Sequence, residues 1–301
     1  MKKVLIGCAI VAGVFVLLSV GTGLGFYFWV KSEIPDMQHA KDARRDLAER
    51  YGHRDDYVPD VQLRPERVEI FLAVRESLLA PRAAIGGRAQ SFLERAKTRS
   101  AEDRGVVRKI ADGIRVARGG LSLFRAGTEY AGLRAGKLLA AGMGEGEYTW
   151  LYGLMSFAWV RWDVQTELGD QWFVDHDMEE VPDELMGQHR RLFTRQLRNQ
   201  RRALEAKTPR TPAEDEALAR ARDALGSGSG GGAFAFQGAL PAEWVAILEP
   251  QRARFTATLP RTPGEFLVES VEQLAEEDRK GLRFEVNSER HARDKESGDE
   301  P

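Results

Sequence analysis

The chain has 301 residues, and 43% of them are hydrophobic, so it is long enough and apolar enough to form at least one large folded domain. Its 44 basic and 46 acidic residues leave a net charge of −2, which excludes nucleic-acid binding through a bulk positive charge. The only cysteine is Cys8, so an internal disulfide is excluded.

Residues 4–30 form an almost uncharged apolar run directly behind Lys2 and Lys3. As a helix this run is about 40 Å long, which exceeds the roughly 30 Å of a bilayer's hydrocarbon core. Tyr27 and Trp29 stand where an interfacial aromatic belt is expected. The pattern predicts a single-pass transmembrane anchor with a short basic head.

Two alternatives to an uncleaved anchor remain open. Ser19 and Gly21 suit the cleavage site of a signal peptide, although the apolar run continues to Val30, well beyond them. The motif Leu5-Ile6-Gly7-Cys8 resembles the lipobox of bacterial lipoproteins, but there the apolar region precedes the cysteine, and here most of it follows. We therefore interpret Cys8 as a small apolar residue inside the anchor.

The orientation of the anchor is less strongly determined, because basic residues flank it on both sides. Lys31, Lys41, Arg44 and Arg45 follow the anchor closely, whereas only the short basic head precedes it. That head is typical of an export signal, which favours an extracytoplasmic position for the large domain. The absence of cysteines after Cys8 agrees with an envelope location without requiring it.

After the anchor the apolar residues recur at helical spacing. Residues 31–62 read as a charged stalk with a short helix from Asp36 to Tyr51. The next apolar stripe predicts a helix that begins at Pro65 and ends at Pro81. Further stripes predict helices around 85–96, 107–121 and 123–141, as the spacing of their apolar residues shows.

The segment 147–168 is the most aromatic of the chain, with Tyr148, Tyr152, Trp159 and Trp162 on one predicted helical face. It is too short for a second membrane span. We interpret it as a central core helix, because aromatic stripes are usually buried. The alternative is a groove that binds a lipid, an aromatic ligand or a partner helix.

A cluster of acidic residues and histidines precedes and enters the next predicted helix. Its candidate metal ligands are His176, Glu180, Glu184 and His189. On a helix Glu180 and Glu184 share a face that His189 does not, and no His-Glu-x-x-His motif occurs. We favour the interpretation that these acids stabilise the positive end of a helix starting near Pro182. A metal or acid–base site is the alternative.

The same helix carries arginines at spacings of four, three and four residues: Arg191, Arg195, Arg198 and Arg202. The spacing places four guanidinium groups in a row, suited to anionic lipid headgroups, an acidic protein or another polyanion. The alternative interpretation is a solvated face whose arginines pair with nearby carboxylates.

Two similar segments, 209–214 and 260–265, each place threonine, proline and glutamate as in a capping box with proline at the first helical position. The glycine-serine run between them has the composition of a flexible linker. Residues 233–236, 254–259 and 282–286 are weakly compatible with short strands.

Together these patterns predict a mainly α protein, with a single N-terminal transmembrane helix, an α-helical soluble domain and a few short strands near the C-terminus. We expect no cofactor. The predicted function is that of a non-enzymatic scaffold, adaptor or ligand-binding module of the cell envelope. The alternative function is that of a hydrolase or metal-dependent enzyme. The predicted parts are an anchor (1–30), a stalk (31–62), a main helical domain (63–225), a linker (226–238), a small helical segment (239–286) and a disordered tail (287–301).

Overall fold

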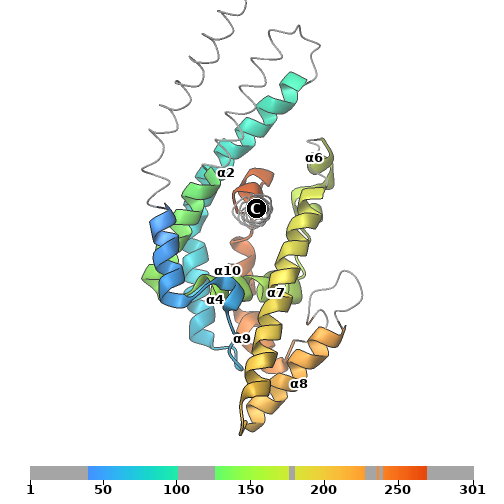
Figure 1. The fold of residues 1–301 in the computed structure, drawn as a ribbon. Coiled ribbons are helices and arrows are strands. Elements are labelled where there is room, and N and C mark those ends of the chain that lie inside the picture. Colours follow the sequence, from blue (N-terminus) through green and yellow to red (C-terminus); the bar gives the residue numbers. More distant parts are fainter. Residues whose placement is uncertain (1–39, 101–125, 176–179, 228–235, 237–239, 270–301) are drawn as a thin grey trace, which may run out of the picture.

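The computed structural model describes residues 40–100, 126–175, 180–227, 236 and 240–269. These residues form helices joined by turns, without a strand among them, which confirms the predicted mainly α fold (Figure 1). Two helices that carry no label in the figure span 126–141 and 263–269, and a third spans 40–51. The other elements are η1 (Arg54–Asp56), α2 (Pro65–Ser100), α4 (Glu145–Gly153), η2 (Leu154–Trp159), α5 (Val164–Leu168), α6 (Asp170–Asp175), α7 (Glu180–Ala206), α8 (Pro212–Ser227), α9 (Ala242–Leu248), η3 (Glu249–Gln251) and α10 (Arg252–Ala257).

Within this part of the chain, no helix combines the length and the apolar character that are needed to cross a bilayer. The apolar run 4–30 lies outside the described residues, so the anchor stays a prediction.

The N-terminal connector, residues 52–64, joins the first helix to α2 and packs on the body of the molecule. The helix 40–51 ends at Gly52, whose φ of 78° lies in the left-handed region that glycine adopts most readily. Leu47 is buried in the core, and Tyr57 and Leu63 of the connector pack against it. The described part of the predicted stalk therefore contributes apolar side chains to the main body.

Helix α2 does not end at Pro81, as the sequence predicted, but continues through it to Ser100. A proline inside a helix removes one hydrogen bond and costs about 3 kcal/mol. The helix continues because its buried face extends past the proline: Leu78 and Ile85 are both buried in the same core. Burial of this face outweighs the local cost.

The aromatic segment is not one continuous α-helix. Helix α4 passes into the π-helical turn η2, which ends at Trp159, and Arg161 then adopts a positive φ of 59°. The Trp162 N–H bonds back to the carbonyl oxygen of Ser156 at 2.7 Å. Trp162 is therefore buried in the core after a turn of the chain. The prediction that Tyr148, Tyr152, Trp159 and Trp162 share one helical face required an unbroken helix.

Helices α7 and α8 form an antiparallel hairpin (Figure 1). Helix α8 starts with the predicted capping box: the Glu214 N–H donates to Thr211 Oγ1 at 3.3 Å, and the Thr211 N–H donates to Glu214 Oε2 at 2.8 Å. The side chain of Lys207 and the backbone of Thr211 lower the pKa of Glu214 to about 2.

The C-terminal segment 240–269 is helical where it is described. Residues 252–257 form helix α10, so the strand predicted across 254–259 is wrong. The local alternation misled because the longer spacing is helical: Leu248, Phe255 and Leu259 are all buried on one face. Of the other two strand-like segments, only Phe236 is described.

One large hydrophobic core holds these elements together, and it draws on distant parts of the chain. Figure 1 shows the long helices α2 and α7 on either side of the helix 263–269, with α4 crossing between them. Buried side chains of the core include Leu47 near the start, Phe71 of α2, Leu197 of α7, and Phe255 and Phe266 near the end. The C-terminal segment is thus part of the same core as the helices before the linker.

Candidate functional site

Helix α7 is the element with the clearest division between a buried and a charged face. Phe193 and Leu197 are buried, and Phe193 stacks on Trp150 of α4 with ring centroids 4.3 Å apart. On the opposite side of the helix, the four arginines of the predicted row are exposed: Arg191, Arg195, Arg198 and Arg202. We call these four residues the arginine face.

Side-chain amides on α7 hold the helix in place by binding backbone carbonyls. Gln196 Nε2 donates to the carbonyl oxygen of Gly146 at 3.0 Å, and Asn199 Nδ2 donates to that of Asp55 at 2.9 Å. Gln200 Nε2 donates to the carbonyl oxygen of Pro59 at 3.0 Å. Because buried amides and carbonyls are costly to leave unpaired, these bonds fix how α7 is rotated and therefore which side chains it exposes.

The arginine face runs along about 16 Å of helix, at 1.5 Å per residue. Arg195 forms an ion pair with Asp55 of η1 while its side chain remains 53% exposed. Arg198 and Arg202 form no ion pair with any residue that the structure describes. At least two guanidinium groups therefore face solvent without a carboxylate from the described chain.

The aromatic residues of the candidate groove lie inside the protein instead. Tyr148, Tyr152 and Trp162 are buried, and Trp159 is half-buried beneath the guanidinium of Arg252, 5.2 Å from its ring centroid. These positions agree with the interpretation of the segment as core. The alternative, a ligand groove, stays a prediction.

A buried ionic cluster, which the sequence analysis missed, lies beside these aromatic rings. Arg75 Nη1 donates to Glu269 Oε1 at 2.9 Å and to the hydroxyl of Tyr148 at 3.0 Å, while its Nη2 donates to the carbonyl oxygen of Thr258 at 2.8 Å. Arg82 Nη1 donates to Glu269 Oε2 at 3.3 Å, and its Nε lies 3.4 Å from Glu265 Oε2. Two arginines thus face two carboxylates in the core.

The charges in this cluster determine the protonation state of Glu269. Burial alone would raise the pKa of the Glu269 carboxyl, but the positive charges of Arg75 and Arg82 hold it below its ordinary value. Burial raises the pKa of Tyr130 and of Tyr152 above the ordinary value of a phenol. At neutral pH Tyr130 and Tyr152 are therefore neutral, and Glu269 carries the negative charge that Arg75 and Arg82 face.

The sequence carried a signal for this cluster. Arg75 and Arg82 occupy the same helical stripe as the apolar residues Val68, Leu72 and Leu78. A charged residue within an apolar stripe indicates a buried charge that requires a partner.

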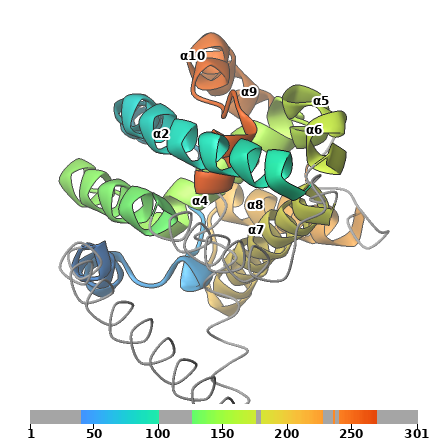
Figure 2. The same cartoon turned by 90° about the horizontal axis from the view of Figure 1, so that it is seen from above.

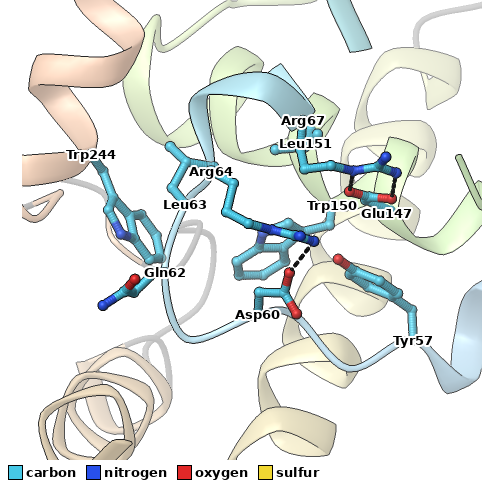
Figure 3. Close-up of a pocket in the computed structure, with 10 residues that line it drawn as sticks. All are labelled: Tyr57, Asp60, Gln62, Leu63, Arg64, Arg67, Glu147, Trp150, Leu151 and Trp244. Carbon is cyan, nitrogen blue, oxygen red and sulfur yellow. Dashed lines mark hydrogen bonds and ion pairs between the residues drawn. The ribbon is translucent and has the colours of Figure 1, made fainter. Parts of the chain in front are cut away.

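A small pocket lies between the connector and the start of α4 (Figure 3). Arg67 binds both carboxylate oxygens of Glu147 there, and Arg64 Nη2 donates to Asp60 Oδ2 at 2.7 Å. The pocket encloses about 20 Å³, which is room for about one water molecule. Its walls are Tyr57, Asp60, Gln62, Leu63, Arg64, Arg67, Glu147, Trp150, Leu151 and Trp244.

The structure describes only part of the candidate metal site. His176 lies outside the described residues, as do the side chains of Glu180 and Glu184. His189 is buried, and its ring packs 5.6 Å from that of Tyr152 and 5.3 Å from that of Phe157. Where the chain is described, no three His, Cys, Asp or Glu side chains are arranged to bind a metal ion.

No model of a protein family, no functionally characterised protein and no solved structure matches this chain.

Proposed function

We propose that this protein is a membrane-anchored helical scaffold of the cell envelope that acts without catalysis and binds an anionic partner through the arginine face of α7. The observation that carries the proposal is the contrast between the two candidate surfaces. Three of the four aromatic residues are buried and Trp159 is half-buried, whereas the arginines are exposed. Arg198 and Arg202 form no ion pair with the described residues.

The rigid support of the arginine face favours recognition over a merely solvated surface. Gln196, Asn199 and Gln200 bind the connector and the start of α4, so the helix that presents the arginines is held at several points along its length. The backbone that carries the arginines is thus already ordered before an anion binds, which lowers the entropic cost of binding.

The anchor supports the envelope location. The apolar run 4–30 behind Lys2 and Lys3 has the length and composition of a spanning helix, and its short basic head favours an extracytoplasmic domain. In this proposal the helical body is held close to the bilayer, and the arginine face meets whatever negative charge lies there.

Crosslinking in intact bacterial membranes tests the proposal. A photo-crosslinking residue replaces Ala206, one turn after Arg202 on α7, or the exposed Ala253 on α10 as a control position. We expect the full-length chain to resist extraction by high salt without detergent, and to form adducts from position 206 that disappear in the Arg198→Glu, Arg202→Glu variant.

Release of the protein by salt alone would contradict the anchor. Equal adducts from positions 206 and 253, or adducts that persist in the charge-reversed variant, would contradict the role of the arginine face.

A further inference from the structure

We infer that the anionic partner of the arginine face is the bilayer itself: Arg198 and Arg202, with Arg191 and Arg195, bind the headgroups of anionic lipids and lay α7 along the membrane surface. This inference rests on the proposed function and names the partner of the same surface.

The position of α7 in the molecule is the first argument. Figure 2 shows the helix 40–51, η1 and α7 along one side of the body, and α2, α9 and α10 along the other. Residue 40 is the described residue closest in sequence to the predicted anchor, 4–30. Residue 40 and α7 thus lie on the same side of the molecule.

The direction of the arginine face is the second argument. Gln196, Gln200 and Leu197 are buried against the connector and α4, on the opposite side of the helix from the arginines. The arginines therefore lie on the side of α7 opposite these buried contacts, and one of them, Arg195, also pairs with Asp55 of η1. A flat bilayer beside this face meets the whole row at once, because α7 is a single helix across these positions.

The chemistry of the surface is the third argument, and it favours lipid over protein. Protein interfaces usually contain buried aromatic or apolar anchors at their centre. Among the described residues, the exposed large hydrophobic side chains are Val58, Leu133 and Val174, none of which belongs to α7. Attraction to lipid headgroups needs no such anchor, because each basic side chain contributes separately and headgroups adjust to the spacing of the charges.

The local charge balance agrees with this assignment. Asp55 already pairs with Arg195, and Glu205 already pairs with Arg201 and Arg222. Asp55 and Glu205 are therefore already engaged, while Arg198 and Arg202 have no ion-pair partner among the described residues.

A fluorescence experiment on the full chain tests the inference. Cys8→Ser removes the native thiol, and Ala206→Cys or Ala253→Cys introduces a single labelling site on α7 or on α10. The labelled protein is reconstituted into phosphatidylcholine vesicles, with or without phosphatidylglycerol, that contain a lipid with a quencher in its headgroup. Flotation of the vesicles reports whether the chain is anchored.

We expect strong quenching at position 206 in anionic vesicles, weak quenching in neutral vesicles, and little quenching at position 253 in either. About 1 M salt, which shortens the screening length to about 3 Å, should abolish the difference. Arg198→Gln with Arg202→Gln should lower the ratio of docked to undocked protein about 30-fold. The matched pair Arg252→Gln with Arg261→Gln, two exposed arginines outside α7, should leave this ratio unchanged.

Several results would overturn the inference. Equal quenching at position 206 in neutral and anionic vesicles would show that headgroup charge plays no part. A floating chain that is never quenched at position 206 would leave the anchored scaffold intact and assign the arginine face to another anion, such as an acidic protein. A chain that does not float with the vesicles would contradict both the inference and the proposed function.

Discussion

Glu269 connects two buried arginines through its two carboxylate oxygens, Oε1 to Arg75 and Oε2 to Arg82. Taking charges out of water is costly, and a buried charge that loses its partner retains that cost without compensation. A substitution that removes the charge of Glu269 should therefore destabilise the folded protein, because it leaves Arg75 and Arg82 buried without this partner.

We expect Glu269→Gln to lower the free energy of unfolding by about 3 kcal/mol at neutral pH, because it leaves Arg75 and Arg82 without a carboxylate that both contact. Chemical denaturation followed by circular dichroism measures this change. Glu249→Gln, which removes an exposed ion pair with Arg252, is the matched control and should cost less than about 1 kcal/mol. Equal effects of the two substitutions would contradict the buried role of Glu269.

The pH dependence has a defined sign. Arg75 and Arg82 lower the pKa of Glu269 in the folded state against the effect of burial, so its stabilising contribution is present above the ordinary pKa of 4.5. That contribution is lost as the pH falls below 4.5 through the lowered value. The stability difference between the native chain and Glu269→Gln should therefore shrink on acidification over this window, and a constant difference would contradict the assignment.

The sequence analysis missed this cluster, because the sequence shows only half of it. The arginines on the apolar stripe of α2 are visible in the sequence, but Glu269 is 194 residues from Arg75. No local pattern connects positions so far apart. The arginine face, by contrast, depends on the spacing within one helix, and the exposure of Arg198 and Arg202 follows that spacing.

At the scale of elements, the contact between α2 and the helix 263–269 depends on glycine. A Cβ atom on Gly86 would lie 2.7 Å from the backbone nitrogen of Glu265 and 2.8 Å from its Cα. The neighbouring Gly87 has open space around the same position. Adjacent glycines of one helix therefore provide a test and its control.

We expect Gly86→Ala to lower the free energy of unfolding by about 1–3 kcal/mol, because the backbone of the helix 263–269 must shift to admit the methyl group. Gly87→Ala should instead raise stability by up to about 1 kcal/mol, since alanine is the better helix former. Denaturant titrations of both variants under identical conditions make the comparison. A stabilising effect of both substitutions would show that the two helices are not in close contact at Gly86.

The prediction of elements succeeded where the helical period was long and failed where a local rule competed with burial. The spacing of the apolar residues in α2 correctly predicted a helix. We predicted that it ends at Pro81, because proline usually ends helices, but the helix continues since Ile85 beyond the proline is buried in the core. At 254–259 a short alternation resembled a strand, although the seven-residue spacing of Leu248 and Phe255 already indicated a helix.

At the scale of the whole molecule, the core joins parts of the chain that the sequence separates with a linker. Phe255 is fully buried, and its ring centroid lies 6.2 Å from that of Phe71 on α2 and 6.4 Å from that of Tyr152. Arg75 also lies 5.8 Å from the Phe255 ring centroid. A single side chain after the linker thus contacts both the apolar core and the ionic cluster.

We expect Phe255→Ala to lower the free energy of unfolding by about 3–5 kcal/mol, as is usual when a large aromatic side chain is removed from a core. Because the helices before and after the linker share that core, the loss should move the whole unfolding transition to lower denaturant concentration. In the native chain, and likewise in the variant, circular dichroism and tryptophan fluorescence should agree on the midpoint of unfolding.

Thr256→Ala, at the exposed neighbouring position, is the control and should change stability by about 0.5 kcal/mol or less. If Phe255→Ala shifted only part of the helical signal, or if the native chain unfolded in two steps, the C-terminal segment would be a separate folding unit, as the division of the sequence at its linker predicts.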